Sequence, residues 1–211
     1  LGCRILHSRR GFAAVTFARC GRAAICERQE KPVEHKLTFL DGAMGTMLQR
    51  HGLKLGEIPE LLAITNPDLL TNIHRQYIEA GTEIVYANTF GANRRKMQKT
   101  PYTVADVVSA AIAAAKKACI GTSARVALDI GPLGELLEPM GTLPFETAVD
   151  MFAEIVDAGV NAGADLICIE TMTDLYEAKA ALLAAKEHST LPVWVTMSFD
   201  ATGRTFTGCT I

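Results

Sequence analysis

The sequence lacks the features that mark three large classes of protein. In its 211 residues, no apolar run approaches the roughly 20 residues that a membrane-spanning helix requires. The formal net charge is -2, so no large excess of positive charge is present to attract nucleic acid or an anionic membrane surface. The glycine patterns G-x-x-x-x-G-K-S/T and G-x-G-x-x-G, which bind nucleotide phosphates, are also absent. These absences argue against a membrane protein, a nucleic-acid-binding protein and a nucleotide-binding module.

Paired cysteines are missing as well. The six cysteines are Cys3, Cys20, Cys26, Cys119, Cys168 and Cys209, and no two of them form a C-x-x-C pair. Cys168 lies in the apolar stretch 166–169, where a buried thiol behaves as a small hydrophobic side chain. We therefore expect six unpaired thiols and a cytoplasmic location, because reducing compartments keep thiols free. A disulfide framework is the weaker alternative.

Residues 1–34 differ in composition from the rest of the chain. They contain seven Lys and Arg residues but only three acids, and they begin with Leu1. An Arg-rich, acid-poor leader is typical of a transit peptide, but no cleavage pattern is visible. We interpret this segment as a disordered basic extension, or as upstream sequence foreign to the natural protein, and we expect one domain over residues 35–211.

The body of the chain alternates expected strands with expected helices. Short apolar runs predict strands at residues 37–40, 83–87, 125–130, 165–169 and 192–199. Helix-start signals stand between them, among them Asn66 before Pro67, and Thr103 three residues before Asp106. Connections of this length predict a parallel sheet in one α/β domain. Two architectures fit: a doubly wound open sheet, or the first part of a (β/α)8 barrel.

Each expected strand ends at or near a polar residue. These residues are Asp41, Asn88, Asp129, Glu170 and Ser198. The carboxyl ends of parallel strands share one edge of the sheet, where ligands bind in both architectures. Three acids and two neutral polar groups at one edge suit a small molecule with an ammonium group, since a neighbouring cation stabilises a carboxylate. The alternative is that these acids only cap the next helix or face solvent.

The turn after the first expected strand, residues 41–46, reads Asp-Gly-Ala-Met-Gly-Thr. Gly42 lets the backbone come close to a ligand, and the N–H groups at the start of the next helix suit a small anion such as a carboxylate. Beside Asp41, this turn predicts a site that holds both ends of an amino acid.

Elsewhere we expect His74 to be a solvated or capping histidine. A basic cluster is expected to form a solvated helix face, and it comprises Arg94, Arg95, Lys96 and Lys99.

Seven motifs in a fixed order resemble the homocysteine S-methyltransferase family, and above all the N-terminal homocysteine-binding domain of cobalamin-dependent methionine synthases. The motifs are DGAMGT at 41–46, TNPD at 65–68, IHR at 73–75, EAG at 79–81, NTFGANR at 88–94, DIGPLG at 129–134 and IETM at 169–172. Each motif alone is a weak signal. Together they extend the resemblance from about residue 37 to residue 207.

The resemblance implies a (β/α)8 barrel of which this chain contains about five of the eight strand–helix units, with the chain truncated after the fifth strand. It also implies a zinc ion, held in the family by a cysteine after the sixth strand and by two in a Gly-Cys-Cys-Gly stretch after the eighth. Zinc lowers the pKa of the substrate thiol, which makes a thiolate available at neutral pH. Those ligand positions are missing from this sequence, so we assign no metal ligand and no catalytic residue in it.

By position, the resemblance assigns five substrate-binding residues. Asp41 and Glu170 match contacts to the amino group of homocysteine, Gly42 and Ala43 match the turn whose backbone meets its carboxylate, and Asn88 lies at the same mouth. The implied reaction is methyl transfer to the homocysteine sulfur, which gives methionine. Methylcobalamin is a possible methyl donor in a full-length protein with folate-binding and cobalamin-binding modules, and this chain alone is expected to be inactive. The alternative function is a metal-free amino-acid-binding or regulatory α/β domain.

Overall fold

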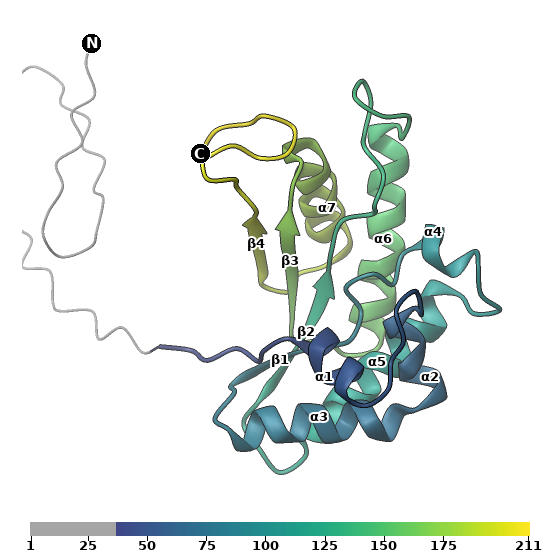
Figure 1. Ribbon diagram of the computed structural model, residues 1–211, viewed down its shortest axis with the longest axis vertical. Coiled ribbons are helices and arrows are strands. Elements are labelled where there is room, and N and C mark those ends of the chain that lie inside the picture. Colours follow the sequence, from purple (N-terminus) through teal and green to yellow (C-terminus); the bar gives the residue numbers. More distant parts are fainter. Residues whose placement is uncertain (1–36) are drawn as a thin grey trace, which may run out of the picture. The chain divides into compact units, whose positions relative to one another are not determined.

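A computed structural model of the chain describes residues 37–211 (Figure 1). The basic extension expected at residues 1–34, with Cys3, Cys20 and Cys26, lies outside the described residues. Of the remaining cysteines, Cys119, Cys168 and Cys209 are free thiols, as expected.

Four parallel strands form the sheet, and each strand pairs with the next one along the chain. The strands are β1 (Ile84–Tyr86), β2 (Arg125–Ile130), β3 (Leu166–Met172) and β4 (Val193–Met197). A doubly wound sheet reverses its strand order at a switch point, whereas the strands of a barrel follow one another around the sheet. The order β1-β2-β3-β4 therefore favours the barrel over the open sheet.

The first of the five expected strands, residues 37–40, is not a strand. Leu40 forms only an isolated parallel bridge with Ile84. The carbonyl oxygen of Phe39 accepts a hydrogen bond from the N–H of Ile84 at 3.3 Å, and the N–H of Asp41 donates to the oxygen of Ile84 at 3.2 Å. Leu37 and Phe39 stay 73% and 61% exposed, so little packing supports a longer ladder. The segment nevertheless brings Asp41 beside the end of β1.

Eight helical segments fill the connections among residues 37–211. They are α1 (Met44–Arg50), the 3-10 helix η1 (Pro59–Leu61), α2 (Leu62–Thr65), α3 (Pro67–Glu79), α4 (Arg94–Met97), α5 (Val104–Cys119), α6 (Phe145–Asn161) and α7 (Leu175–His188). The expected helix starts are confirmed: Asn66 accepts a hydrogen bond from the N–H of Leu69, and Thr103 and Asp106 form a capping box. No helix of the described residues is long and apolar enough to cross a membrane.

The two faces of the sheet differ, because alternate residues of a strand point to opposite sides. On one face, strand residues join a large apolar core with α3, α5, α6 and α7, and they include Val85, Val126, Leu128, Ile167 and Ile169. On the other face lies a small cluster of Ile84, Ala127, Leu166 and Cys168, packed with Tyr86. Helix α6 lies close to β2 because Gly159 has no side chain: a Cβ there would be 2.5 Å from Leu128. Helices therefore cover one face, and the other is left for the site.

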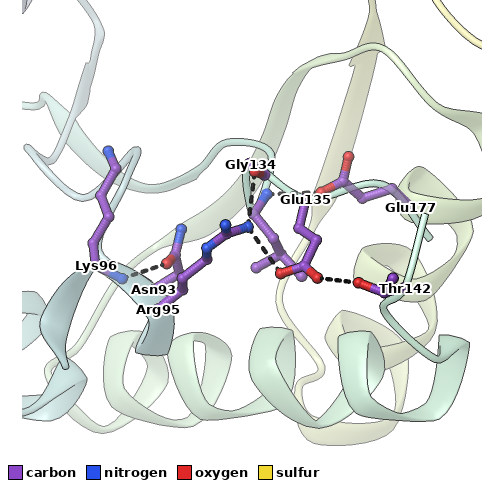
Figure 2. A network of polar contacts seen from close by, with 8 residues as sticks. Asn93, Arg95, Lys96, Gly134, Glu135, Thr142 and Glu177 are labelled. Carbon is purple, nitrogen blue, oxygen red and sulfur yellow. Dashed lines mark hydrogen bonds and ion pairs between the residues drawn. The ribbon is translucent and has the colours of Figure 1, made fainter.

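A long loop, residues 131–144, follows β2 and is held at both sides by polar contacts (Figure 2). Arg95 of α4 donates to a carboxylate oxygen of Glu135 at 2.8 Å. The N–H of Leu133 donates to Glu177 of α7 at 2.7 Å. The prediction of a solvated basic face therefore holds only in part, because the half-exposed side chains of Arg94 and Arg95 are also in ion pairs, the former with Glu154.

Candidate ligand-binding site

A cavity of about 480 Å³ opens at the carboxyl end of the sheet. All five residues expected to bind substrate line it, namely Asp41, Gly42, Ala43, Asn88 and Glu170. Asp129 and Glu60 add two further carboxyl groups, while no Lys, Arg or His residue is among the described residues that line it. Ser198, at the end of the fifth expected strand, is not one of the lining residues either. Parallel pairing thus brings acids from distant parts of the sequence into one cavity.

Asp41 is held at the edge of this cavity by the backbone of β1. One of its carboxylate oxygens accepts a hydrogen bond from the N–H of Tyr86 at 3.0 Å, and its side chain is almost fully buried. Burial raises the pKa of Asp41 to about 7, against the lowering effect of the Tyr86 N–H, and the nearby charge of Glu170 adds to the rise. Near neutral pH, Asp41 is therefore partly protonated while the cavity is empty.

His74 is not the solvated or capping histidine that the sequence suggested. It is 0% exposed, and its Nδ1 atom lies 3.9 Å from a carboxylate oxygen of Asp41. Neither ring nitrogen has a hydrogen-bond partner among the described residues. Burial lowers the pKa of His74 to about 4, so the ring is neutral at pH 7. The helical spacing could have predicted this burial, because Leu70, four residues earlier on the same face of α3, is also buried.

Asp129 has a fixed backbone but an unsatisfied side chain. Its N–H donates to the hydroxyl oxygen of Thr89 at 3.1 Å, and the same hydroxyl donates to the carbonyl oxygen of Asp129 at 2.8 Å. The residue is 6% exposed, and its Oδ1 atom has no hydrogen-bond partner among the described residues. Burial raises the pKa of Asp129 to about 9, and the charges of Glu170, Asp41 and Glu60 add to the rise. Asp129 is therefore a neutral acid at pH 7 in the empty cavity.

An irregularity of β3 aims Glu170 at the cavity. Ile169 pairs with Val195 and Met172 pairs with Met197, so two residues of β3 stand opposite one residue of β4. Such a bulge bends a strand and turns its side chains, and it is common beside active sites. Thr171 has a φ of 53°, the only positive φ of a non-glycine residue in the described part of the chain. This bend follows Glu170, whose pKa is raised by burial.

Glu60 is a lining residue that sequence reasoning missed. It lies in η1, away from every expected strand end, so the pattern that marked the other acids gave no signal for it. One of its oxygens accepts a hydrogen bond from the N–H of Gly91 at 2.7 Å and lies 3.5 Å from Nζ of Lys96. The other oxygen is buried without a partner among the described residues. Glu60 is thus better compensated than Asp129, although both border the cavity.

Gly42 and Asn88 complete the mouth of the cavity. A Cβ atom at Gly42 would lie 3.1 Å from the ring and the hydroxyl oxygen of Tyr77, which is tighter than most Cβ contacts. A larger residue at this turn would therefore press on Tyr77. The side-chain amide of Asn88 donates to the carbonyl oxygen of Pro59 at 2.8 Å, and this bond fixes the amide at the mouth.

The described residues do not fit a zinc ion. No group of three or more His, Cys, Asp or Glu side chains in residues 37–211 is arranged so that it could hold a metal. Cys119 lies in α5, Cys168 lies in β3 with its sulfur 3.2 Å from the hydroxyl oxygen of Tyr86, and Cys209 follows β4. We therefore assign no residue of this part of the chain to a metal.

Comparison with known sequences identifies the family of the chain. A sequence model of the homocysteine S-methyltransferase family matches residues 38–211. The methionine synthase of Mycobacterium tuberculosis is 33% identical over 190 residues, which covers 81% of this chain and 16% of that protein. The methionine synthase of Mycobacterium leprae is 32% identical over 191 residues, with the same two shares. The chain thus spans 16% of the length of these relatives.

Comparison with solved structures shows the fold. The crystal structure of the Escherichia coli homocysteine methyltransferase MmuM in its metallated form matches with a TM-score of 0.73 at 20% identity, over 83% of this chain and 67% of that chain. The apo form matches with a TM-score of 0.65 at 22% identity, over 83% and 64%. These neighbours are (β/α)8 barrels, so the four parallel strands are part of a barrel, as the resemblance implied. With the sequence match from residue 38 to residue 211, the chain belongs to the homocysteine S-methyltransferase family.

Proposed function

We propose that residues 37–211 bind homocysteine in the carboxyl-end cavity, as the substrate-recognition part of an enzyme that methylates its sulfur to give methionine. The observation that carries this proposal is that Asp41 and Glu170, far apart in sequence, line one cavity together with the Gly42–Ala43 turn. Family membership supports the choice of homocysteine as the ligand.

The acids of the cavity suit the ammonium group of the substrate. A carboxylate 4 Å from a cation gains roughly 1 kcal/mol in water and about 4 kcal/mol in a partly screened site near a protein surface. We assign Asp41 and Glu170 to this group because both border the cavity at the carboxyl end of the sheet, Asp41 beside β1 and Glu170 in β3. The backbone of Gly42 and Ala43 is assigned to the substrate carboxylate, and Asn88 to the mouth of the cavity.

Methyl transfer itself has no assigned residue in this part of the chain. The sulfur must lose its proton and form a bond to the methyl carbon, while the donor leaves with the electron pair that held the methyl group. Zinc binding, methylcobalamin as donor, and folate-binding and cobalamin-binding modules belong to our proposal for a longer protein, as does a cytoplasmic location. We propose that residues 37–211 alone bind homocysteine without methylating it.

Calorimetric titration of the 211-residue chain with L-homocysteine tests the proposal. We expect binding in the wild type and at least about tenfold weaker binding in Asp41→Asn and in Glu170→Gln, which corresponds to about 1.4 kcal/mol or more. Asp165→Asn, at the opposite end of the sheet, is the matched control and should bind as the wild type does. Unchanged affinity in both cavity variants would contradict the proposal, as would equal affinity for 4-mercaptobutanoic acid, which lacks the amino group.

The alternative function, a metal-free amino-acid-binding or regulatory domain, uses the same cavity. Zinc analysis of a longer protein that contains residues 37–211 separates the two, together with an assay for methionine formation by the same protein. Homocysteine binding with no methionine formation in the longer protein would favour the alternative.

A further inference from the structure

The carboxyl-end cavity is lined by more carboxyl groups than one ammonium group could neutralise if all of them were ionised. Its four carboxyl groups belong to Asp41, Glu60, Asp129 and Glu170, and no basic residue lines it among the described residues. Like charges in a poorly hydrated site repel one another strongly, so such groups do not all ionise together. At least one of these carboxyl groups must hold a proton while the cavity is empty.

The neighbours of the four acids differ, and this difference selects one of them. Asp41 receives the N–H of Tyr86 at 3.0 Å, and Glu60 receives the N–H of Gly91 at 2.7 Å. Hydrogen bonds from N–H groups stabilise the ionised form of a carboxyl group. The Oδ1 atom of Asp129 accepts no such bond, although only 6% of the residue is exposed. Glu170 is less buried than Asp129.

Among residues 37–211, the groups around Asp129 provide no positive charge that would stabilise its ionised form. The titratable side chains nearest to it on the strands and in the cavity are Asp41, Glu60, Tyr86, Cys168 and Glu170, which are all neutral or negative. His74 lies behind Asp41 and is neutral at pH 7, and Lys96 lies 3.5 Å from Glu60. Burial and the neighbouring acids raise the pKa of Asp129 to about 9. Asp129 is therefore the carboxyl group of this cavity that keeps its proton to the highest pH.

We propose that Asp129 is a proton-holding residue of the binding site: it is a neutral carboxylic acid in the empty cavity and ionises when the ammonium group of an amino acid enters. This inference rests on the proposed function, because it assumes that an amino acid occupies the cavity. The ligand enters as R-NH3+, the carboxyl proton of Asp129 leaves to solvent, and a carboxylate–ammonium pair remains. Binding thus releases one proton.

Proton release makes the affinity depend on pH and on the charge of the ligand. With one proton released, the association constant rises about tenfold per pH unit while Asp129 is protonated in the empty protein. A ligand without an ammonium group does not stabilise the ionised form of Asp129, so its carboxyl proton stays bound. The cavity therefore favours ligands with an ammonium group over uncharged amines and amides.

Calorimetric titration of the 211-residue chain with L-methionine tests the inference. Methionine is the proposed product and has the same ammonium and carboxylate groups as homocysteine. It has no thiol, so any released proton comes from the protein. Titrations at about pH 7.5 in phosphate and in Tris, which differ in ionisation enthalpy, give the number of protons released. We expect about one in the wild type and in the control Asp165→Asn. In Asp129→Asn we expect only the fraction that the partly protonated Asp41 releases, because the amide at position 129 has no proton to lose at this pH.

A ligand-free measurement accompanies the titration. In protein labelled with 13C at the aspartate carboxyl carbons, the Asp129 signal is identified by its loss in Asp129→Asn, and we expect it to titrate well above pH 7. An ordinary Asp129 pKa of about 4 would overturn the inference. So would methionine binding without proton release, or with equal release in Asp129→Asn; either result leaves the proposed function standing. Failure of both homocysteine and methionine to bind would overturn the proposed function and this inference together.

Discussion

The two ends of the sheet treat an aspartate in opposite ways. At the amino end, Asp165 accepts hydrogen bonds from Nζ of Lys116 at 2.7 and 2.8 Å and from the N–H of Val126 at 2.7 Å. At the carboxyl end, Asp129 is more deeply buried, yet its Oδ1 atom has no partner among the described residues. Asp129 lies in β2, and Asp165 directly precedes β3, which pairs with β2 in parallel.

This contrast separates stability from function within the same sheet. In (β/α)8 barrels the amino end serves stability, and the carboxyl end carries the active site. At the amino end, the carboxylate of Asp165 is hydrogen-bonded within the protein by Lys116 and the N–H of Val126, so it is not available to a ligand. At the carboxyl end, unsatisfied acids are costly in the empty protein, and in our proposal the ammonium group of the ligand relieves that cost. On this proposal, ligand affinity comes at the expense of stability, and only at the carboxyl end of the sheet.

The largest expected effect is on the pH dependence of stability at the carboxyl end. The pKa of Asp129 is raised from 3.8 to about 9 in the folded protein. A raised folded-state pKa stabilises the protein at low pH, and this stabilisation is lost as the pH rises from the unfolded towards the folded value. Relative to the wild type, Asp129→Asn should therefore gain up to about 4 kcal/mol in free energy of unfolding between about pH 5 and pH 8. Urea denaturation at the two pH values measures the gain.

Asp165→Asn is the control for this experiment, because it changes the same residue type at the satisfied end. Its free energy of unfolding relative to the wild type should not show a comparable gain at pH 8. Parallel pH profiles for Asp129→Asn and the wild type would mean that Asp129 ionises in the folded protein as it does in the unfolded chain. The contrast between the two ends would then be lost.

Much of the arrangement at the carboxyl end of the sheet can be predicted from the sequence, because it depends on the alternation of residues along each strand and on the parallel topology. Alternating faces and parallel pairing bring strand ends to one edge, so Asp41, Asn88 and Glu170 were expected at one cavity and they line it. Glu60 was not expected, since its place depends on how η1 packs over the mouth and on its bond to Gly91. Residues 37–40 were expected to form a strand, but exposed side chains limit their pairing to one bridge. Such details depend on tertiary contacts that no local pattern encodes.

A smaller effect is expected from the base buried behind the site. Burial lowers the pKa of His74 from 6.5 to about 4, so the unfolded chain takes up a proton at this residue before the folded protein does. Stability that is fully present above pH 6.5 is therefore lost as the pH falls towards 4. We expect the wild type to lose up to about 3 kcal/mol more than His74→Gln between about pH 6.5 and pH 4.5, as measured by urea denaturation.

His188→Gln is the matched control, because His188 is an exposed histidine that lies 3.0 Å from Asp157 at the surface. Its acid profile should follow that of the wild type closely. Equal slopes for His74→Gln and the wild type would show that His74 titrates normally in the folded protein. The carboxyl end would then carry unsatisfied acids but no unsatisfied base.

The smallest effect is expected at the amino end. Asp165→Asn removes the charge that Lys116 and the N–H of Val126 contact, but both side chains of the ion pair are about one-third exposed, so solvent screens the pair. We expect a loss of about 1–2 kcal/mol in the free energy of unfolding, measured by urea denaturation at pH 7. Homocysteine affinity should stay within about twofold of the wild type, because the change lies at the opposite end of the strands from the cavity. A loss of affinity comparable to that of Asp41→Asn would mean that the two ends are coupled, and stability and binding could not then be assigned to separate ends of one sheet.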